Sequence, residues 1–314
     1  MTVGNMDSNS PRNILITGAT GLIGSALRSA LTNRGDRVVP IVRKMRKDLQ
    51  DAIVWDGKSE LSTEHLRKME GIDAVVNLAG ESIFGRFTEG KKKRIRESRI
   101  GLTEKLCEGL AALETRPRVL VSASATGIYA PYAGSDQDEL APLGNEFLSE
   151  VCRDWEAAAS AAGELGIRVV HLRITPVLST KGGMLKVMLL PFRMNLGGRI
   201  GSGAQYVSWI ALEDMISLIL FCIDHDDVVG PVNAASPNAV TNNEFTETLA
   251  AALHRMKGPP LPEFAARLAF GREAAEELML ASVKAVPRHA LDAGFQFRHR
   301  ELDAALRHIL ANGV

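Results

Sequence analysis

The sequence predicts an α/β fold built on a doubly wound parallel sheet, with a smaller α+β lobe formed by the C-terminal part of the chain. Short apolar segments alternate with amphipathic helical patterns through roughly the first 180 residues, as in βαβ units that place helices on both faces of a sheet. The first of these segments runs directly into a glycine-rich turn and a helix. Glycine and proline breaks at 181–183, 197–203 and 259–260 then interrupt the pattern and predict the separate lobe.

The individual strands and helices follow from the periodicity of apolar residues. Strands are expected where short runs are rich in Val, Ile and Leu, at 14–17, 38–42, 53–55, 74–78, 119–122 and 168–172. Helices are expected where apolar residues recur every three or four positions, at 21–34, 63–69, 88–113 and 147–165. We therefore predict a sheet domain over 12–180 with a return segment near 205–237, and a substrate lobe over 181–204 and 238–314.

The first predicted strand and helix carry the pattern of a dinucleotide site. Gly18, Gly21 and Gly24 are spaced three apart between the strand and the helix. Gly18 permits a tight turn, Gly21 lets backbone N–H groups approach a pyrophosphate, and Gly24 lets the helix pack closely on the sheet. This context predicts a Rossmann domain whose cofactor contacts include Gly18, Thr20, Gly21, Leu22, Ile23 and Gly24.

The residues after the second strand indicate which dinucleotide binds. An acidic residue there usually binds the ribose 2′-hydroxyl of NAD, whereas a basic residue accommodates the 2′-phosphate of NADP. Here Val42 is followed by the basic run Arg43–Lys47, with no acid before Asp48. These cations favour NADP(H), with Arg43 at the 2′-phosphate. The alternative is a basic loop that is only solvated.

Composition excludes several classes of protein. The 37 Lys and Arg balance the 37 Asp and Glu, so no net charge attracts nucleic acid or an anionic membrane. Residues 1–11 lack the apolar core of a signal peptide and are expected to be a disordered lead-in. Three scattered cysteines suit a reducing cytoplasm and indicate no metal site. We expect a cytoplasmic protein with a small-molecule substrate and neither a nucleic-acid nor a membrane partner; a homodimer is kept as an option.

Further motifs make the chain resemble a known family. They are Asn77–Glu81, Ser98–Gly101, Ser122–Gly127, Glu150–Glu156, Leu189–Arg193, Gly201–Gln205, Ser208–Ile210 and Ala293–Phe297. With them, residues 12–310 resemble the extended short-chain dehydrogenase/reductases, within the atypical branch labelled nucleoside-diphosphate-sugar epimerase family. The resemblance implies further cofactor contacts from Val42, Arg43, Leu78, Ala79, Gly80, Arg94, Arg99, Ser122 and Val177.

Arg99 can also be assigned from its helix alone. Ile95, Arg99, Leu102, Leu106 and Leu110 form one stripe of the predicted helix, and Arg99 is the only charge on it. A guanidinium on a buried stripe is costly unless it is paired. A cofactor phosphate is a suitable partner for the bidentate guanidinium. The alternative is an internal ion pair with a buried carboxylate.

The catalytic pair of the resembled family is missing. Working members place a Tyr, and a Lys four residues later, at the start of the helix predicted over 147–165, where the Lys lowers the Tyr pKa for proton exchange. Those positions are Leu148 and Cys152 here. Ser124 matches the family serine and is one catalytic candidate. Glu81, at the carboxyl end of the strand 74–78, is the other, although it could equally cap the following segment.

Two classes of function therefore stay open. One is an NADP(H)-dependent oxidoreductase or epimerase acting on an unidentified small molecule, such as a nucleotide sugar, with a rearranged acid/base set. The other is a non-catalytic protein that senses or binds NADP(H). Three other features are expected to be structural, namely Tyr129 and His171 in the core and Lys91–Lys93 on a solvated helix face.

Overall fold

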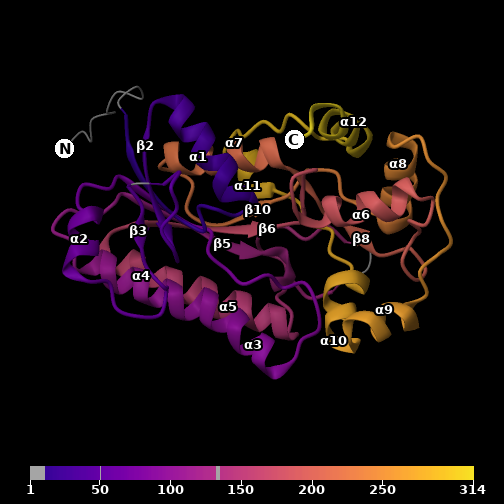
Figure 1. The fold of residues 1–314 in the computed structure, drawn as a ribbon, viewed down its shortest axis with the longest axis horizontal. Helices are drawn as coiled ribbons and strands as arrows, with labels where there is room; N and C mark the ends of the chain where they lie inside the picture. The colour runs from indigo at the N-terminus through magenta and orange to yellow at the C-terminus, as the bar shows by residue number, and fades with distance from the viewer. Residues whose placement is uncertain (1–10, 50, 132–134) are drawn as a thin grey trace.

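The centre of the molecule is a seven-stranded, entirely parallel sheet with strand order β10-β6-β5-β4-β1-β2-β3 (Figure 1). It is seen in a computed structural model that describes residues 11–49, 51–131 and 135–314. Apart from Pro11, the predicted lead-in 1–11 lies outside these residues. The sheet strands are β1 Asn13–Thr17, β2 Arg37–Val42, β3 Ile53–Val54, β4 Ala74–Asn77, β5 Val119–Ala125, β6 Arg168–Ile174 and β10 Gly230–Ala234. The predicted doubly wound fold is confirmed.

Two apolar clusters cover the two faces of this sheet. One face packs against α1 and α7, and the other against α2, α4 and α5, with the interior filled mainly by Val, Ile, Leu and Ala. The bounds are α1 Leu22–Arg34, α2 Thr63–Met69, α4 Leu102–Ala111, α5 Phe147–Ser160 and α7 Leu212–Asp224. Because both faces are covered, the strands are apolar on both sides, as the sequence pattern requires.

The helix predicted over 88–113 is interrupted by a π-helical turn. It consists of α3 Glu89–Arg96, the π turn η1 Glu97–Gly101, and α4. A π turn adds one residue to a helical turn and often marks a functional position. Arg99 lies inside this turn, so the only charged residue of the apolar stripe coincides with the break in the regular α-helix.

Pro40 lies within β2, where a missing backbone N–H would normally disturb the sheet. The Val42 carbonyl accepts a hydrogen bond from the Trp55 N–H just beyond β3. Since backbone groups two residues apart point to the same side of a strand, Pro40 also faces β3. That short strand pairs only with Ile41 and Val42, so no ladder bond is lost at Pro40.

The C-terminal lobe has an apolar core of its own. Leu185, Phe192, Trp209, Phe245 and Leu306 are among the side chains that fill it. Its elements are α6 Gly183–Arg193, α8 Asn242–Ala252, α9 Glu263–Phe270, α10 Arg272–Ala275, the π turn η4 Glu276–Leu280 and α12 Leu302–Asn312, with the short pairs β7 Val177–Leu178/β9 Ile210–Ala211 and β8 Tyr206–Val207/β11 Val240–Thr241. No helix of the described residues has the length and apolarity needed to cross a membrane.

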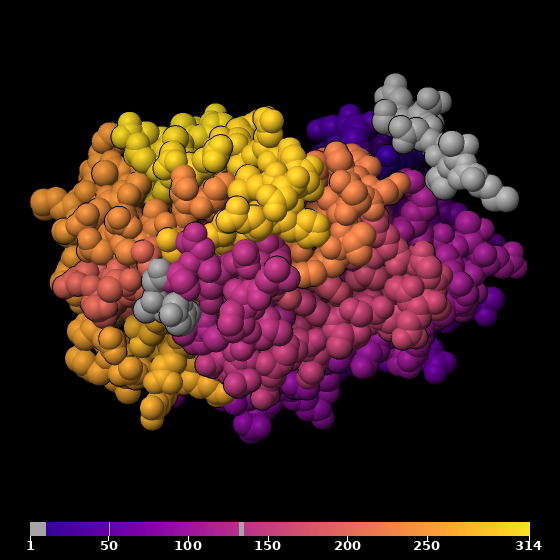
Figure 2. All heavy atoms as spheres, turned by 180° about the vertical axis from the view of Figure 1, so that it is seen from behind, coloured from indigo at the N-terminus to yellow at the C-terminus, as the bar shows by residue number. Residues whose placement is uncertain are grey.

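One segment expected in the lobe packs on the sheet instead. Ala290, in α11 Arg288–Asp292, together with Phe295 and Phe297, belongs to the apolar cluster under β1, β4, β5 and β6. Figure 2 shows this yellow C-terminal stretch lying against the magenta middle of the chain. The tail therefore completes the core of the sheet domain before α12 returns to the lobe. No periodic pattern predicts this return, because the segment is short and irregular.

Candidate dinucleotide site and its polar network

The glycine-rich turn has the geometry expected of a phosphate-binding turn. Gly18 adopts a left-handed backbone with φ 65°, and a Cβ there would lie 2.5 Å from the Leu78 carbonyl oxygen. A Cβ at Gly24 would overlap the carbonyl oxygen of Gly18. Both positions therefore exclude side chains, for the reasons predicted. The turn lies beside the carboxyl ends of β1 and β4. Strands β2 and β3 are added on one side of β1 and the later strands on the other, and such folds bind ligands at this switch point.

The N-terminus of α1 is open to an anion. Gly21 is its N-cap and supplies no side-chain hydrogen bond, and the first turn contains no acidic residue. The first N–H groups of a helix have no intrahelical acceptor and carry partial positive charge. Leu22 packs against Gly182, and a Cβ at Gly183 would lie 3.0 Å from the Val177 carbonyl oxygen. The loop after β7 thus bounds the site next to the predicted contact Val177.

Buried hydrogen bonds tie together the carboxyl ends of three strands. Thr17 Oγ1 donates to Asn77 Oδ1 at 2.6 Å, and it accepts from the N–H groups of Leu78 and Ala79, each at 3.1 Å. Asn77 Nδ2 donates to Thr103 Oγ1 at 2.8 Å and to Ser122 Oγ at 3.3 Å. This network fixes the backbone at Leu78 and Ala79. It also places the predicted contact Ser122 in the buried layer below the rim.

Arg99 faces this rim without a carboxylate partner. A Cβ at Gly80 would lie 3.1 Å from Arg99 Cζ, so the guanidinium lies against that glycine. It stacks 5.2 Å from the centroid of the Trp155 ring. Among the described residues, no carboxylate oxygen lies within 4.0 Å of it, and burial lowers the pKa of the guanidinium. The described residues therefore provide no carboxylate for the internal ion pair that was the alternative role of Arg99.

Glu81 is held by two cations. Its carboxylate accepts a hydrogen bond from Lys91 Nζ at 3.1 Å and lies 3.6 Å from Arg94 Nε. The hydrogen bond from Lys91 is the main cause that lowers the pKa of Glu81. A carboxyl stabilised as its anion is a poor proton donor. The expectation that Lys91–Lys93 form a solvated helix face is therefore only partly right. Lys91 binds Glu81, and Lys92 Nζ lies 2.7 Å from Glu273 Oε1 of the lobe, whereas Lys93 stays exposed.

The basic loop that follows β2 is solvent-exposed. Arg43 is solvent-exposed and follows the buried Val42 at the carboxyl end of β2. Sequence reasoning missed a second cation there. Arg28 of α1 donates to the Ala19 carbonyl at 3.3 Å and helps to lower the pKa of Asp48, although the hydrogen bond from Arg46 is the larger cause. Its position one helical turn after Gly24 is the signal that could have identified it.

Ser124 is part of a buried ionic network. Its hydroxyl donates to Glu156 Oε1 at 2.7 Å, and only 2% of Ser124 is exposed. Arg173 binds both oxygens of Glu156, from Nε and Nη2, each at 2.9 Å. Arg173 Nη1 also donates to the Tyr129 hydroxyl and to the Glu139 carbonyl, both at 3.0 Å. The serine proton is thus directed to a carboxylate of the protein.

Tyr129 lies in the core, as predicted. It is 1% exposed, donates to Asn233 Oδ1 at 2.7 Å, and burial raises its pKa to about 12. His171 is also buried, but only half satisfied, because Nε2 lies 3.0 Å from Ser160 Oγ while Nδ1 has no partner among the described residues. Burial lowers the pKa of His171. Neither side chain is an accessible proton donor.

The positions of the missing catalytic pair are apolar or inert. Leu148 and Cys152 are 8% and 4% exposed, and burial raises the pKa of the Cys152 thiol to about 11. The lobe supplies a carboxylate that sequence reasoning missed. Glu277 Oε2 accepts the Leu148 N–H at 2.8 Å, and burial raises the pKa of Glu277. Because Glu277 is 129 residues from Leu148, no local pattern could have indicated this contact.

Comparisons with known proteins agree with this geometry. Residues 14–235 match the NAD dependent epimerase/dehydratase family, and residues 261–309 match a domain of unknown function, DUF1731. The chain is 40% identical over 294 residues to epimerase family protein Mb2239 of Mycobacterium bovis, covering 93% of this chain and 96% of that protein. It is 36% identical over 302 residues to the human epimerase family protein SDR39U1, covering 95% and 99%.

Two solved structures show the same fold. The structure of human SDR39U1, isoform 2, with NADPH has a TM-score of 0.87 and 35% identity, covering 96% of this chain and 99% of that chain. The nucleoside-diphosphate sugar epimerase of Corynebacterium glutamicum has a TM-score of 0.80 and 33% identity, covering 97% of this chain and 59% of that one. These matches confirm the resemblance to the extended short-chain dehydrogenase/reductases that the motifs indicated. The chain belongs to the NAD dependent epimerase/dehydratase family.

Proposed function

We propose that this chain binds NADP(H) between the glycine-rich turn and the rim of β4, and acts as an oxidoreductase or epimerase on a small molecule without a Tyr–Lys pair. The observation that carries the proposal is the half-buried Arg99 guanidinium, which lies against Gly80 with no carboxylate partner in the described chain. A charge placed in this way requires an anion. The structure of the human relative SDR39U1 with NADPH supports the same cofactor.

The residues present fit such a cofactor. Gly18 and Gly24 leave room for a backbone cradle, and the open N-terminus of α1 suits the pyrophosphate. Arg43 and Arg28 would meet the adenosine 2′-phosphate, while Leu78, Ala79 and Gly80 would line the ribose of the nicotinamide. Bound NADP(H) supplies a hydride donor or acceptor. The chain itself must supply binding, orientation and proton exchange.

Replacing Arg43 with alanine is expected to reduce the preference for NADPH over NADH about tenfold, because one charged contact with the 2′-phosphate is lost. The exposure of Arg43 to screening solvent keeps the effect at this lower end. Fluorescence titration of both cofactors into wild type and variant measures the preference. Lys93→Ala, on an exposed helix face, is the matched control. Equal affinities of the wild-type protein for NADPH and NADH would contradict the proposal.

Turnover is expected to be slow and independent of tyrosine. Loss of a positioned acid/base group typically lowers a rate by about 10²–10⁴. NADPH oxidation, followed by absorbance with a panel of carbonyl compounds, would detect a reductase substrate. Chromatography of nucleotide sugars after incubation would detect an epimerase substrate, because epimerisation consumes no net cofactor. With that substrate, Tyr129→Phe should leave the rate unchanged, because this phenol is buried with a pKa of about 12. A loss of turnover in Tyr129→Phe with unchanged cofactor affinity would show that a tyrosine takes part.

A non-catalytic NADP(H) sensor is the second candidate, and one observation favours it. Ser124 donates its proton to Glu156, and Glu81 is ion-paired with Lys91, so both catalytic candidates are engaged within the protein. Tight NADPH binding with no turnover across the panel would support the sensor. If turnover is found, Ser124→Ala and Glu81→Gln distinguish the two candidates as proton carriers.

A further inference from the structure

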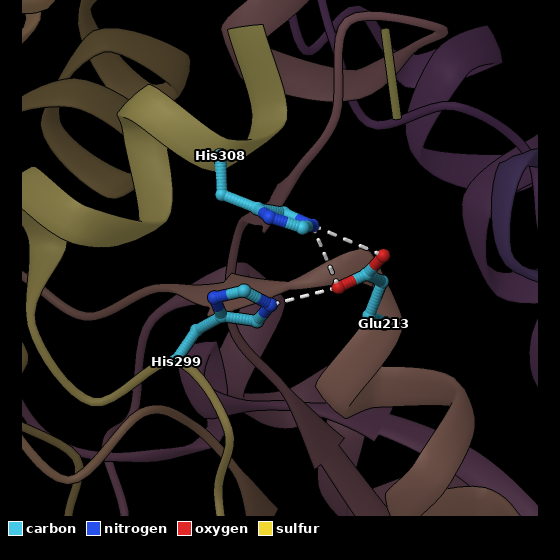
Figure 3. A group of neighbouring side chains, drawn as sticks. All are labelled: Glu213, His299 and His308. Carbon is cyan, nitrogen blue, oxygen red and sulfur yellow. Dashed lines mark hydrogen bonds and ion pairs between the residues drawn. The ribbon is translucent and has the colours of Figure 1, made fainter. Parts of the chain in front are cut away.

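A cluster of side chains that could bind a metal includes none of the residues assigned to the dinucleotide site. Glu213, in the first turn of α7, lies beside His299 and His308, which come from the loop before α12 and from α12 itself. Figure 3 shows both imidazole rings directing a nitrogen toward the Glu213 carboxylate. His299 Nε2 is 2.8 Å from Glu213 Oε2, and His308 Nε2 is 3.1 Å from the same oxygen. Three chain segments thus present one ligand atom each to a common point.

The donor set is that of a transition-metal site. Two imidazole nitrogens and one carboxylate oxygen bind Zn²⁺ in proteins, with a water completing the tetrahedron. The three ligand atoms lie within 4.8 Å of one another, whereas tetrahedral Zn²⁺ with bonds of about 2.0–2.1 Å needs them about 3.3 Å apart. The nitrogen–oxygen contacts of 2.8 and 3.1 Å would lengthen by a few tenths of an ångström. The two histidine nitrogens, which lie within 4.8 Å of each other, would approach by up to about 1.5 Å through rotation of the imidazole rings.

The surroundings hold the ligands in place. Asp214 is 2% exposed, and its two carboxylate oxygens accept the backbone N–H groups of Arg298 and His299 at 2.9 and 2.8 Å. His299 is consequently fixed beside α7, with only 8% of its surface exposed. Such contacts orient ligands before the ion arrives.

Solvent reaches two of the three candidate ligands. The side chains of Glu213 and His308 are 30% and 36% exposed, which leaves an entry path and room for a bound water. Arg298 Nη1 lies 3.7 Å from Glu213 Oε2 and would compete with a cation, but 74% of the Arg298 side chain is exposed. It can turn into solvent at little cost, since exposed ion pairs contribute little.

We propose that Glu213, His299 and His308 form a site for a divalent transition metal of the Zn²⁺ type that fastens α12 to α7. Such a site uses no cysteine, so the scattered cysteines that argued against a metal could not have indicated it. The metal would bind the folded chain in preference to the unfolded one, and it would therefore stabilise the fold in proportion to its concentration. None of the three residues is among those proposed to contact the cofactor.

Titration of ZnCl₂ into the untagged full chain, after removal of metals with EDTA, tests the proposal by calorimetry. Wild type is expected to bind one equivalent and to melt at a higher temperature with Zn²⁺. His308→Gln should weaken binding by at least about tenfold and remove the melting shift, because a ligand is lost. His308 is the variant of choice, since its partial exposure makes the substitution tolerable where His299→Gln could unfold the tail.

The control is His254→Asn, which removes an exposed histidine outside the cluster. Asparagine tolerates the left-handed backbone at this position, φ 54°. This variant should bind Zn²⁺ as wild type does. X-ray absorption of the wild-type complex should show nitrogen and oxygen ligands at about 2.0–2.1 Å. Absence of saturable binding in wild type, or equal binding by His308→Gln, would overturn the assignment.

Discussion

Replacing Arg173 with alanine is expected to lower the free energy of unfolding by about 3–5 kcal/mol, because it leaves a buried carboxylate without its cation. The Arg173 and Glu156 side chains are only 6% and 14% exposed. Burial alone would lower the pKa of Arg173, but the hydrogen bonds to Glu156 raise it. The variant would also orphan the Glu139 carbonyl and remove a donor to Tyr129. Urea unfolding followed by circular dichroism measures the loss.

Arg307→Ala provides the matched control. Arg307 pairs with Asp303 at 3.0 Å, but the two side chains are 70% and 53% exposed, and such a pair contributes less than about 1 kcal/mol. Glu156→Gln should fall between the two, because it keeps a hydrogen-bond acceptor and removes the charge. Similar losses in Arg173→Ala and Arg307→Ala would show that the buried network does not hold the fold together.

Replacing Arg99 with alanine is expected to weaken NADPH binding by up to about a hundredfold, the loss of a charge-assisted contact in a partly desolvated site. The cofactor-free protein should lose about 1 kcal/mol or less. The lost cation–π contact with Trp155 is opposed by removal of a half-buried charge that has no carboxylate partner in the described chain. Calorimetric titration with NADPH and melting curves of the cofactor-free protein measure the two effects separately.

Two further variants make the Arg99 experiment specific. Arg99→Lys keeps the charge but not the planar fork, so it should restore only part of the affinity. Arg96→Ala removes a neighbouring cation that pairs with Asp154 on the outer face of the helices, and it should leave NADPH binding unchanged. A large fall in the melting temperature of cofactor-free Arg99→Ala would assign Arg99 a structural role instead.

The features that the sequence predicted correctly are local. The glycine turn and the six strands could be identified because strand, turn and helix signals lie within a few residues of one another. The glycine roles at Gly18 and Gly24 were likewise confirmed, since steric exclusion at a tight turn follows from the backbone alone.

The features that the sequence could not predict depend on contacts between distant elements. Glu156 and Arg173 look like ordinary charges on a helix and a strand until the fold places them 2.9 Å apart. Glu277 at Leu148 and the Glu213–His299–His308 cluster are joined only by tertiary packing. The apolar periodicity continues through Glu97–Gly101, so it does not predict the π turn there.

The return of the tail to the sheet has a consequence for synthesis on the ribosome. The edge strand β10 and the core residues Phe295 and Phe297 are made after β5, which ends at Ala125. Translation at about 5–20 residues per second separates Ala125 from Phe297 by roughly 9 to 34 s. During that interval the nascent sheet exposes apolar surface that only the last segments cover. Late acquisition of protease resistance by the emerging chain is therefore expected.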